Sequence, residues 1–591
     1  MQIDDLIELF ETKRYELGID EALDSDDYAS YPPALKALTT EKAHSATSGL
    51  STLAQGDAQG ITAALEMLIE ADKRMLKRIV QHQNTNQHQK LVALIKSALE
   101  NKRKIFLLGC GASGRAALQL EKILNISNLH AIMGGGDTAL VAAIEKFEDH
   151  REYGIRQLHQ AGWQPGDLVI GLSASGTAPF VNGILEHVAN NSGSRGTPCA
   201  ILFLNNDCDE VKTNSPSHPL HKEELPIEYY SLNVGPNAIT GSSRMQSASV
   251  AGIELGDALT KATDREPSSS ANKLIEALER NKNAIKQLHE LTNLEAIAYQ
   301  ANEAVTYIAD EDIGLTVFTD VTERAPTFGV PPIDNLNTPP SDSSRYAKAF
   351  VTVRAKDKND MRNTWEIMLG RTPRFLNWLE APSTSTEHSL GYDFKVGSEK
   401  KRGCYSQNKE QHYLEIKKDK TYFHFYYDNK EISKIDIRGL NLMQATTLLK
   451  MVLNAHSTTL MAKLGYVAGN KMTHVQPSNV KLIARIVRYI WELITVPNTK
   501  DLTRDQCETI KRKLGNKLTH IYEIFKQEVA VIKPGESIVL RCAERLKKEL
   551  LEYQPPSLSN KAMAYFSPAA QQAKMNAAAQ SSSQIVFGAQ R

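Results

Sequence analysis

The sequence predicts an α/β protein with two tandem doubly wound parallel sheets, preceded and followed by helices. Short apolar runs alternate with helical patterns over residues 104–206, and a second series of the same kind begins at residue 304. Strands that alternate with helices form parallel sheets covered on both faces. The polar, serine-rich segment 261–273 separates the two series, which are candidates for diverged copies of one unit.

Composition excludes several classes of protein. A length of 591 residues predicts several domains. The 69 Lys and Arg residues balance 69 Asp and Glu residues, which argues against a general nucleic-acid binder. The six cysteines form no CxxC pair and no HExxH occurs, so we expect neither metal nor cofactor. Without a secretory signal or a membrane-length apolar stretch, the prediction is a cytoplasmic protein.

Residues 1–100 are expected to be helical. Apolar residues recur at three- and four-residue spacing in 68–83 and 88–101, and Pro32 and Pro33 mark a break. The stretch HQNTNQHQ, which contains His82 and His88, is interpreted as a polar loop rather than a metal site.

The first α/β series continues strand by strand. Its strands are expected in KIFLLGCGASG, LHAIMGGGD, DLVIGLSASG and CAILFLNN, and its helices within 117–125, 138–162 and 180–191.

The second series is shorter. Residues 304–323 predict a strand, a turn and a helix, and 347–360 a strand that ends in a loop. Residues 412–428 alternate around a KDK turn and predict a hairpin. Helices dominate from Gln444, and the Ala-, Gln- and Ser-rich tail beyond Pro555 is expected to be disordered.

The loop Gly109–Arg115 follows the first strand and precedes a helix. Its glycines, the hydroxyl of Ser113 and the helix N-terminus suit an anion. As a literal GxGxxG it also fits a dinucleotide fingerprint, with Asp137 as the downstream acid, or a plain strand–helix turn.

Two further loops favour a phosphorylated small molecule. Ser173–Pro179 follows the third strand and has three hydroxyls and a glycine within five residues. Gly235–Arg244 carries hydroxyls, a glycine and a cation before a later helix. Ligands of open α/β sheets bind at the carboxyl ends of the strands, where the first two loops lie.

As a set, these loops resemble the sugar isomerase (SIS) family, in the branch of N-acetylmuramic acid 6-phosphate etherases and glucokinase regulatory proteins. GCGASGR is similar to the branch's G-x-G-T-S-G-R, GLSASGTAPFV to G-I-A-A-S-G-R-T-P-Y-V, and VGPNAITGSSRMQ to V-G-P-E-x-x-T-G-S-S-R-M-K. Residues 453–485 are similar to the branch's L-N-x-x-S-T helix and the following S-N-x-K-L, and TEKAHSATSGL to its N-terminal segment.

The spacing of these motifs is that of the regulatory proteins. Some 200 residues separate the GSSRM segment from the LNxxST helix, and within them DIGLTVFTDVTERAPTFGVPP resembles L-D-A-S-E-C-P-P-T-F-G, which implies a second SIS domain. The implied domains are a helical segment 1–100, a first SIS domain 101–262, a second SIS domain 273–500 that includes a shared helix 453–485, a helical lid 501–555 and a tail 556–591.

The resemblance implies one phosphosugar site, in the first domain. The second domain has Ala309–Ile313, with three acids, where the family has a glycine–serine loop, and acids repel phosphate. The implied binding residues are Gly111, Ala112, Ser113, Gly114, Arg115, Glu148, Ser173, Ser175, Gly176, Thr177, Gly241, Ser242, Ser243 and Arg244.

The etherases use two glutamates, and the resemblance implies Glu148 and Glu323 as that pair, should the chain be an etherase. The first domain has Ile123 at the second glutamate position, and Glu121 points elsewhere on its helix. Two family lysines are replaced by Gln246 and Tyr466, with Lys463 and Lys471 near the latter.

Two functions remain open. The tandem arrangement favours a sugar-phosphate-sensing regulator that controls a partner such as a sugar kinase, while the glutamates favour a carbon–oxygen lyase of the etherase type. A dinucleotide enzyme is a weaker third hypothesis. His456 and Ser457 are helix neighbours and do not face each other, so they are not expected to form a nucleophile pair.

Overall fold

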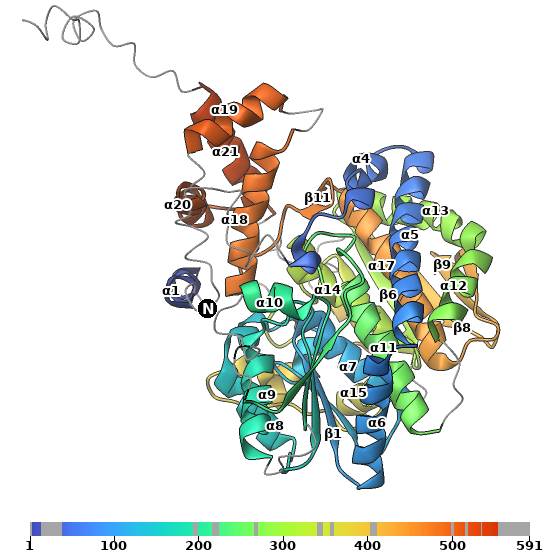
Figure 1. The fold of residues 1–591 in the computed structure, drawn as a ribbon. Helices are drawn as coiled ribbons and strands as arrows, with labels where there is room; N and C mark the ends of the chain where they lie inside the picture. The colour runs from blue at the N-terminus through green and yellow to red at the C-terminus, as the bar shows by residue number, and fades with distance from the viewer. Residues whose placement is uncertain are drawn as a thin grey trace, which may run out of the picture.

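Two five-stranded sheets and the helices around them make up the computed structural model (Figure 1). The structure describes residues 3–13, 38–192, 199–214, 221, 224–264, 270–339, 347–354, 360–401, 410–497, 502–514, 518–533 and 535–552. Pro32, Pro33 and the tail from 556 onward lie outside the described residues.

The first sheet is entirely parallel, as predicted. Its order is β2-β1-β3-β4-β5, with the bounds β1 Ile105–Gly109, β2 Leu129–Met133, β3 Leu168–Leu172, β4 Ala200–Leu204 and β5 Ile227–Ser231. Strand β5 (IEYYS) was not predicted, because its exposed edge position leaves only a partly buried pattern.

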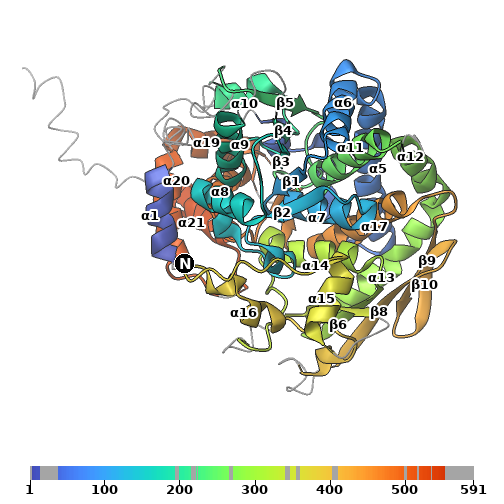
Figure 2. The ribbon, with the colours of Figure 1, turned by 90° about the horizontal axis from the view of Figure 1, so that it is seen from below.

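Helices cover both faces of this sheet. Phe106 and Leu108 pack with α8 (Arg151–Gln160) and α9 (Pro179–Asn191). The alternate residues Ile105 and Leu107 join a second core with α7 (Gly111–Leu124) and α11 (Gln246–Ala262). Because successive strand side chains point to opposite faces, two separate cores are the mark of a doubly wound sheet (Figure 2).

The second sheet is mixed rather than purely parallel. Its order is β10-β9-β8-β6-β7, and only β6, β7 and β8 run parallel. The antiparallel part is the predicted KDK hairpin, extended by one strand that was not predicted. The bounds are β6 Ala304–Asp310, β7 Ala349–Arg354, β8 Gln411–Lys418, β9 Tyr422–Tyr427 and β10 Lys430–Asp436. Helix α14 (Gly314–Phe328) follows β6 as expected.

Helix α17 (Leu442–Lys463) is buried along nearly its whole length. It packs against α14 of the second half and against α5 (Ala58–His82) of the N-terminal segment.

The shared helix expected over residues 453–485 is not one continuous helix. These residues comprise the end of α17, the hairpin β11 (Val467–Ala468) and β12 (Lys471–Met472), and the start of α18 (Val480–Thr495).

A group of helices packs around α18, to one side of the two sheets (Figure 1). Phe10 of α1 lies 5.1 Å, ring to ring, from Tyr522 of α20. The group comprises α1 Ile3–Lys13, α19 Arg504–Leu514, α20 Leu518–Val529 and α21 Ile538–Glu552.

The remaining elements connect these layers. They are α4 Leu50–Ala54, α6 Asn86–Glu100, α10 Cys208–Asn214, α12 Ser270–Arg280, α13 Lys282–Gln300, α15 Met361–Leu369 and α16 Thr386–Leu390, with the 3-10 helices η2 Thr39–Glu41, η3 Ser45–Thr47, η4 Asp137–Leu140, η5 Glu145–Asp149, η8 Pro382–Thr384 and η9 Ser398–Lys401. None of the described helices is both long and apolar enough to span a membrane.

Candidate functional site

The three predicted loops meet at one pocket beside the carboxyl ends of β1 and β3. Its empty volume is about 830 Å³, counting the part that is open to solvent. The sequence-predicted residues that line it are Gly111, Ala112, Ser113, Glu148, Ser173, Ser175, Gly241, Ser242, Ser243, Arg244 and Glu323.

Two glycines of the pocket have a positive φ, and one of them also lies too close to its neighbours for a Cβ atom. Gly111 has φ +50°, and a Cβ there would lie 4.0 Å from Oε1 of Glu323. Gly241 has φ +69°, and a Cβ there would lie 2.5 Å from Nε of Arg485. A larger residue at 241 is therefore both strained and blocked.

The second loop is organised by its own hydroxyls. The backbone N–H of Gly176 donates to Ser173 Oγ at 3.1 Å, and the hydroxyls of Ser175 and Thr177 lie 2.8 Å apart. These bonds shape the turn after β3 and hold Ser173 and Ser175 at the pocket wall.

Four predicted residues do not line the pocket: Gly114, Arg115, Gly176 and Thr177. Gly114 packs against β1, where a Cβ would lie 2.6 Å from the carbonyl oxygen of Gly109. The Arg115 side chain is fully buried and donates to Glu323 and, at 2.6 Å, to the carbonyl of Ala139. Arg115 thus positions a carboxylate of the other half of the chain.

Glu145 and Glu148 lie on the 3-10 helix η5, where an α-helix over 138–162 was predicted. Three glycines at 134–136 precede this stretch, and the α-helix begins only at Arg151. Side chains three residues apart eclipse each other in a 3-10 helix, so both carboxylates face the pocket. Glu145 was not singled out from the sequence.

Each of these two carboxyls has a distinct environment. Glu148 Oε1 lies 2.5 Å from Nζ of Lys481. Burial, together with the charges of Glu148 and Glu323, raises the pKa of Glu145 from 4.5 to about 7. Asn479 donates to Glu145 at 3.1 Å. The pocket therefore combines an ion-paired carboxylate with a carboxyl that retains its proton near neutral pH.

Glu323 reaches the same pocket from α14, in the second half of the chain. Its side chain is 8% exposed and forms an ion pair with Arg115. The structure thus brings Glu148 and Glu323 together across the two halves.

Arg244 has spare hydrogen-bonding capacity. Its Nη2 donates to Asp320 at 2.8 Å and to Ser457 at 2.5 Å. Its Nε and Nη1 are buried and have no hydrogen-bond partner among the described residues. Buried donors are nearly always paired, so two free ones at a pocket indicate a place for an acceptor.

Sequence reasoning missed several pocket residues on segments far from the three loops. Lys481 and Asn479 belong to S-N-x-K-L, and Glu41 to TEKAH, so the quoted motifs contained this signal. Glu41 accepts from Arg485 at 2.6 Å and from Arg488 at 3.0 Å. The missed polar lining residues are Thr40, Glu41, Glu145, Thr327, Asn479, Lys481 and Arg485, together with Asn237 within the third loop.

The two residues that replace family lysines, Gln246 and Tyr466, do not line the pocket. Gln246 donates to Asp72 at 2.7 Å, and the ring of Tyr466 lies 4.4 Å from that of His474. Three cations nevertheless line the pocket: Arg244, Lys481 and Arg485.

Ion pairs occupy the corresponding turn of the second half. Arg354 pairs with Asp310 at 2.9 Å, Lys418 pairs with Asp312 at 2.7 Å, and Lys122 donates to the carbonyl of Glu311 at 2.8 Å. Glu121 pairs with Arg371 and Arg374, both at 2.8 Å, and lies outside the pocket.

The histidines have structural partners. His456 lies 2.7 Å from Glu295, whereas Ser457 bonds Asp320, so the two do not form a pair. His82 and His88 lie on α5 and α6 rather than in a loop, and both contact Glu254 at 2.9 Å.

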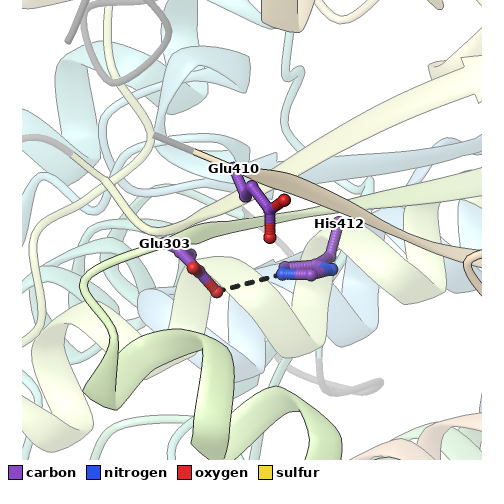
Figure 3. A group of neighbouring side chains, drawn as sticks. All are labelled: Glu303, Glu410 and His412. Carbon is purple, nitrogen blue, oxygen red and sulfur yellow. Dashed lines mark hydrogen bonds and ion pairs between the residues drawn. The ribbon is translucent and has the colours of Figure 1, made fainter. Parts of the chain in front are cut away.

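A group of possible metal ligands, Glu303, Glu410 and His412, lies at the amino ends of β6 and β8 (Figure 3). Their ligand atoms lie within 4.8 Å of one another. Burial alone would lower the pKa of His412, but Asp428 at 2.7 Å and Glu303 at 3.1 Å outweigh it and raise the pKa. Both ring nitrogens of His412 are thus engaged by carboxylates, Nε2 by Glu303 and Nδ1 by Asp428, so we interpret the group as ion pairs.

Known proteins resemble this chain in parts. The model of the glucokinase regulatory protein N-terminal SIS domain matches residues 87–189. A solved structure, the C-terminal domain of glucosamine-fructose-6-phosphate aminotransferase from Francisella tularensis, covers 66% of this chain and 96% of its own, with 11% identity and a TM-score of 0.31.

Curated relatives are N-acetylmuramic acid 6-phosphate etherases. That of Bacteroides thetaiotaomicron is 31% identical over 207 residues, which cover 32% of this chain and 69% of the relative. That of Bacteroides fragilis is 34% identical over 168 residues, 27% of this chain and 54% of the relative, so this chain spans about half of its length. By these sequence matches and its loops, the chain belongs to the SIS family, in the branch of the N-acetylmuramic acid 6-phosphate etherases and glucokinase regulatory proteins.

Proposed function

We propose that the pocket binds a sugar phosphate and that the chain is a carbon–oxygen lyase of the etherase type. One observation carries this proposal: Glu148 and Glu323, which lie 175 positions apart in sequence, line the same pocket. Removal of a sugar C2 proton and departure of the C3 substituent need two carboxyls that act as base and acid.

The phosphate is expected at the small-residue loops. Ser113 lies in the first turn of α7, whose N-terminus offers free N–H groups and a positive dipole end. Ser175 and Ser242 supply hydroxyls from the other two loops, and the unpartnered Nε and Nη1 of Arg244 supply charged donors.

The carboxyls suit the two proton transfers of this reaction. Glu148, which forms an ion pair with Lys481, accepts the C2 proton as the C3–O bond breaks and lactate leaves. A protonated carboxyl must assist the leaving oxygen. The charge of Glu323 helps to raise the pKa of Glu145 to about 7, so that Glu145 keeps a proton in the same pocket. Water then adds at C3 to give the hydroxyl.

The second candidate is a sugar-phosphate-sensing regulator of a partner such as a sugar kinase. The match to the glucokinase regulatory protein domain favours it. So does the Arg115–Glu323 ion pair, which holds one carboxylate of the pair. In such a protein the ligand shifts the population of the conformer that binds the partner.

Lactate release from N-acetylmuramic acid 6-phosphate separates the two candidates. We expect release by the unaltered protein and by Glu152→Gln, an exposed control, with loss in Glu148→Gln and in Glu323→Gln. No lactate from a protein that the same compound stabilises thermally would favour the regulator. Neither lactate nor stabilisation would overturn the sugar-phosphate site itself.

A further inference from the structure

A second pocket lies on the exposed face of α5, outside the site described above. Its empty volume is about 760 Å³, counting the part open to solvent. We call it the α5 pocket and define it by His44, Arg74, Lys77, Arg78, Gln81 and Pro236.

Three cations of the α5 pocket share one helix face. Arg74, Lys77 and Arg78 are all exposed, and their spacing of three and four residues places them side by side. Arg74 and Arg78 have no ion-pair partner among the described residues, and Lys77 has only the distant charge of Glu279.

Neighbouring lysines, unlike these arginines, form ion pairs with acidic side chains. Lys73, also on α5, pairs with Glu70 at 2.9 Å and with Glu279 at 2.6 Å. Lys286 on α13 pairs with Glu66 at 2.9 Å. In a chain with equal numbers of acidic and basic residues, a pocket with unpaired arginines is a local positive region.

The residues around the α5 pocket do not neutralise the positive charge of Arg74, Lys77 and Arg78. Gln246 is neutral and bonds Asp72 at 2.7 Å, and burial raises the pKa of Asp72 to about 7. Burial, together with the charge of Arg74, lowers the pKa of His44, as expected in a positive field. The His44 Nδ1 accepts from the N–H of Ala46, which leaves its Nε2 as a donor.

We propose that the α5 pocket binds a small molecule that carries a diphosphate or triphosphate group. One guanidinium group can donate two parallel hydrogen bonds to two oxygens of a phosphate. Four residues of helix separate Arg74 from Arg78, a rise of about 6 Å, which linked phosphates span better than one phosphate does.

Calorimetry on the full chain with pyrophosphate and tripolyphosphate tests the proposal. Arg74→Gln/Arg78→Gln is expected to weaken binding at least about tenfold. Lys73→Gln/Lys286→Gln removes two paired cations from neighbouring helices and is expected to retain the affinity. Arg74 and Arg78 are exposed, whereas Lys73 and Lys286 are partly buried, so melting temperatures are measured to show that both variants fold.

Four outcomes would overturn the proposal. The first is equal affinity in the arginine variant, and the second is an equal loss in the lysine control, which would indicate non-specific attraction. The third is a loss confined to Ser113→Ala/Ser242→Ala, which would place the anion in the first pocket. Hexaglutamate that binds more tightly than tripolyphosphate would point to an acidic protein segment instead.

Discussion

The turns after β1 and β6 occupy corresponding places in the two sheets, yet they differ in chemistry. After β1, Gly111, Ala112 and Ser113 leave an open pocket at the N-terminus of α7. After β6, Asp310 and Asp312 pair with Arg354 and Lys418 ahead of α14. The same strand–turn–helix unit thus frames a pocket in one half and an ion-pair cluster in the other.

The second half of the chain therefore contributes a carboxylate to the pocket of the first half, although ion pairs fill its own turn after β6. Helix α14 presents Glu323 to the pocket of the first half, where Arg115 holds it. Variants on the two turns test this difference.

The largest effect is expected from Arg115→Met, which breaks the buried contact between the halves. An unpaired, buried Glu323 costs about 3–5 kcal/mol of the free energy of unfolding, measured by urea denaturation. Arg115→Met/Glu323→Leu should recover much of this loss. A single-variant loss below about 1 kcal/mol would contradict the assigned role of Arg115.

Next, Ser113→Ala/Ser242→Ala is expected to weaken sugar-phosphate binding about 100-fold, since each hydroxyl loses a hydrogen bond to a charged group. Calorimetry measures it. The matched control is Asp310→Asn/Asp312→Asn on the filled turn, which should bind normally. Equal affinities in both variants would mean that the ligand does not use the β1 turn.

Glu145→Gln tests the raised pKa of Glu145 in the pocket beside the β1 turn. Folded Glu145 keeps a proton up to about pH 7, whereas the unfolded chain releases it near 4.5, so stability falls as pH rises between these values. The variant removes this dependence. Relative to the unaltered protein, the free energy of unfolding of the variant should rise by about 3 kcal/mol between pH 4.5 and 8, measured by urea denaturation. A difference in the free energy of unfolding between the two proteins that does not change with pH would refute the raised pKa of Glu145.

The smallest effect is expected from Arg354→Gln on the filled turn. Arg354 is 30% exposed, so loss of its pairs with Asp310 and Glu415 should cost about 1 kcal/mol. Sugar-phosphate affinity should stay unchanged. Weaker binding in this variant would show that the filled turn still acts on the pocket.

The sequence predicted the parts of the fold that depend on local pattern. The parallel sheet, the KDK hairpin and the strand–turn–helix around residue 310 follow from apolar runs and turn residues. Edge strands β5 and β10 were missed because half-exposed strands lack an apolar run. The 3-10 helix at Glu145 was missed because its residues also fit an α-helical period.

The site was predictable where its residues belong to recognisable motifs, which include the three loops and Glu323 on α14. Ser113, Ser175 and Ser242 line the pocket, as the loop motifs suggested. The turn of Arg115 toward Glu323, and the approach of Lys481 to Glu148, depend on packing between distant segments. No local pattern encodes such contacts, so only the structure shows them.

Glu323 and the three loops belong to one chain. The pocket therefore stays assembled at any protein concentration. Were the two halves separate subunits, the pocket would be complete only to the extent that they associate. A covalent connection keeps the local concentration of one half around the other constant, whatever the total amount of protein. Occupancy of the pocket then reports the amount of ligand alone, even for a protein present in few copies.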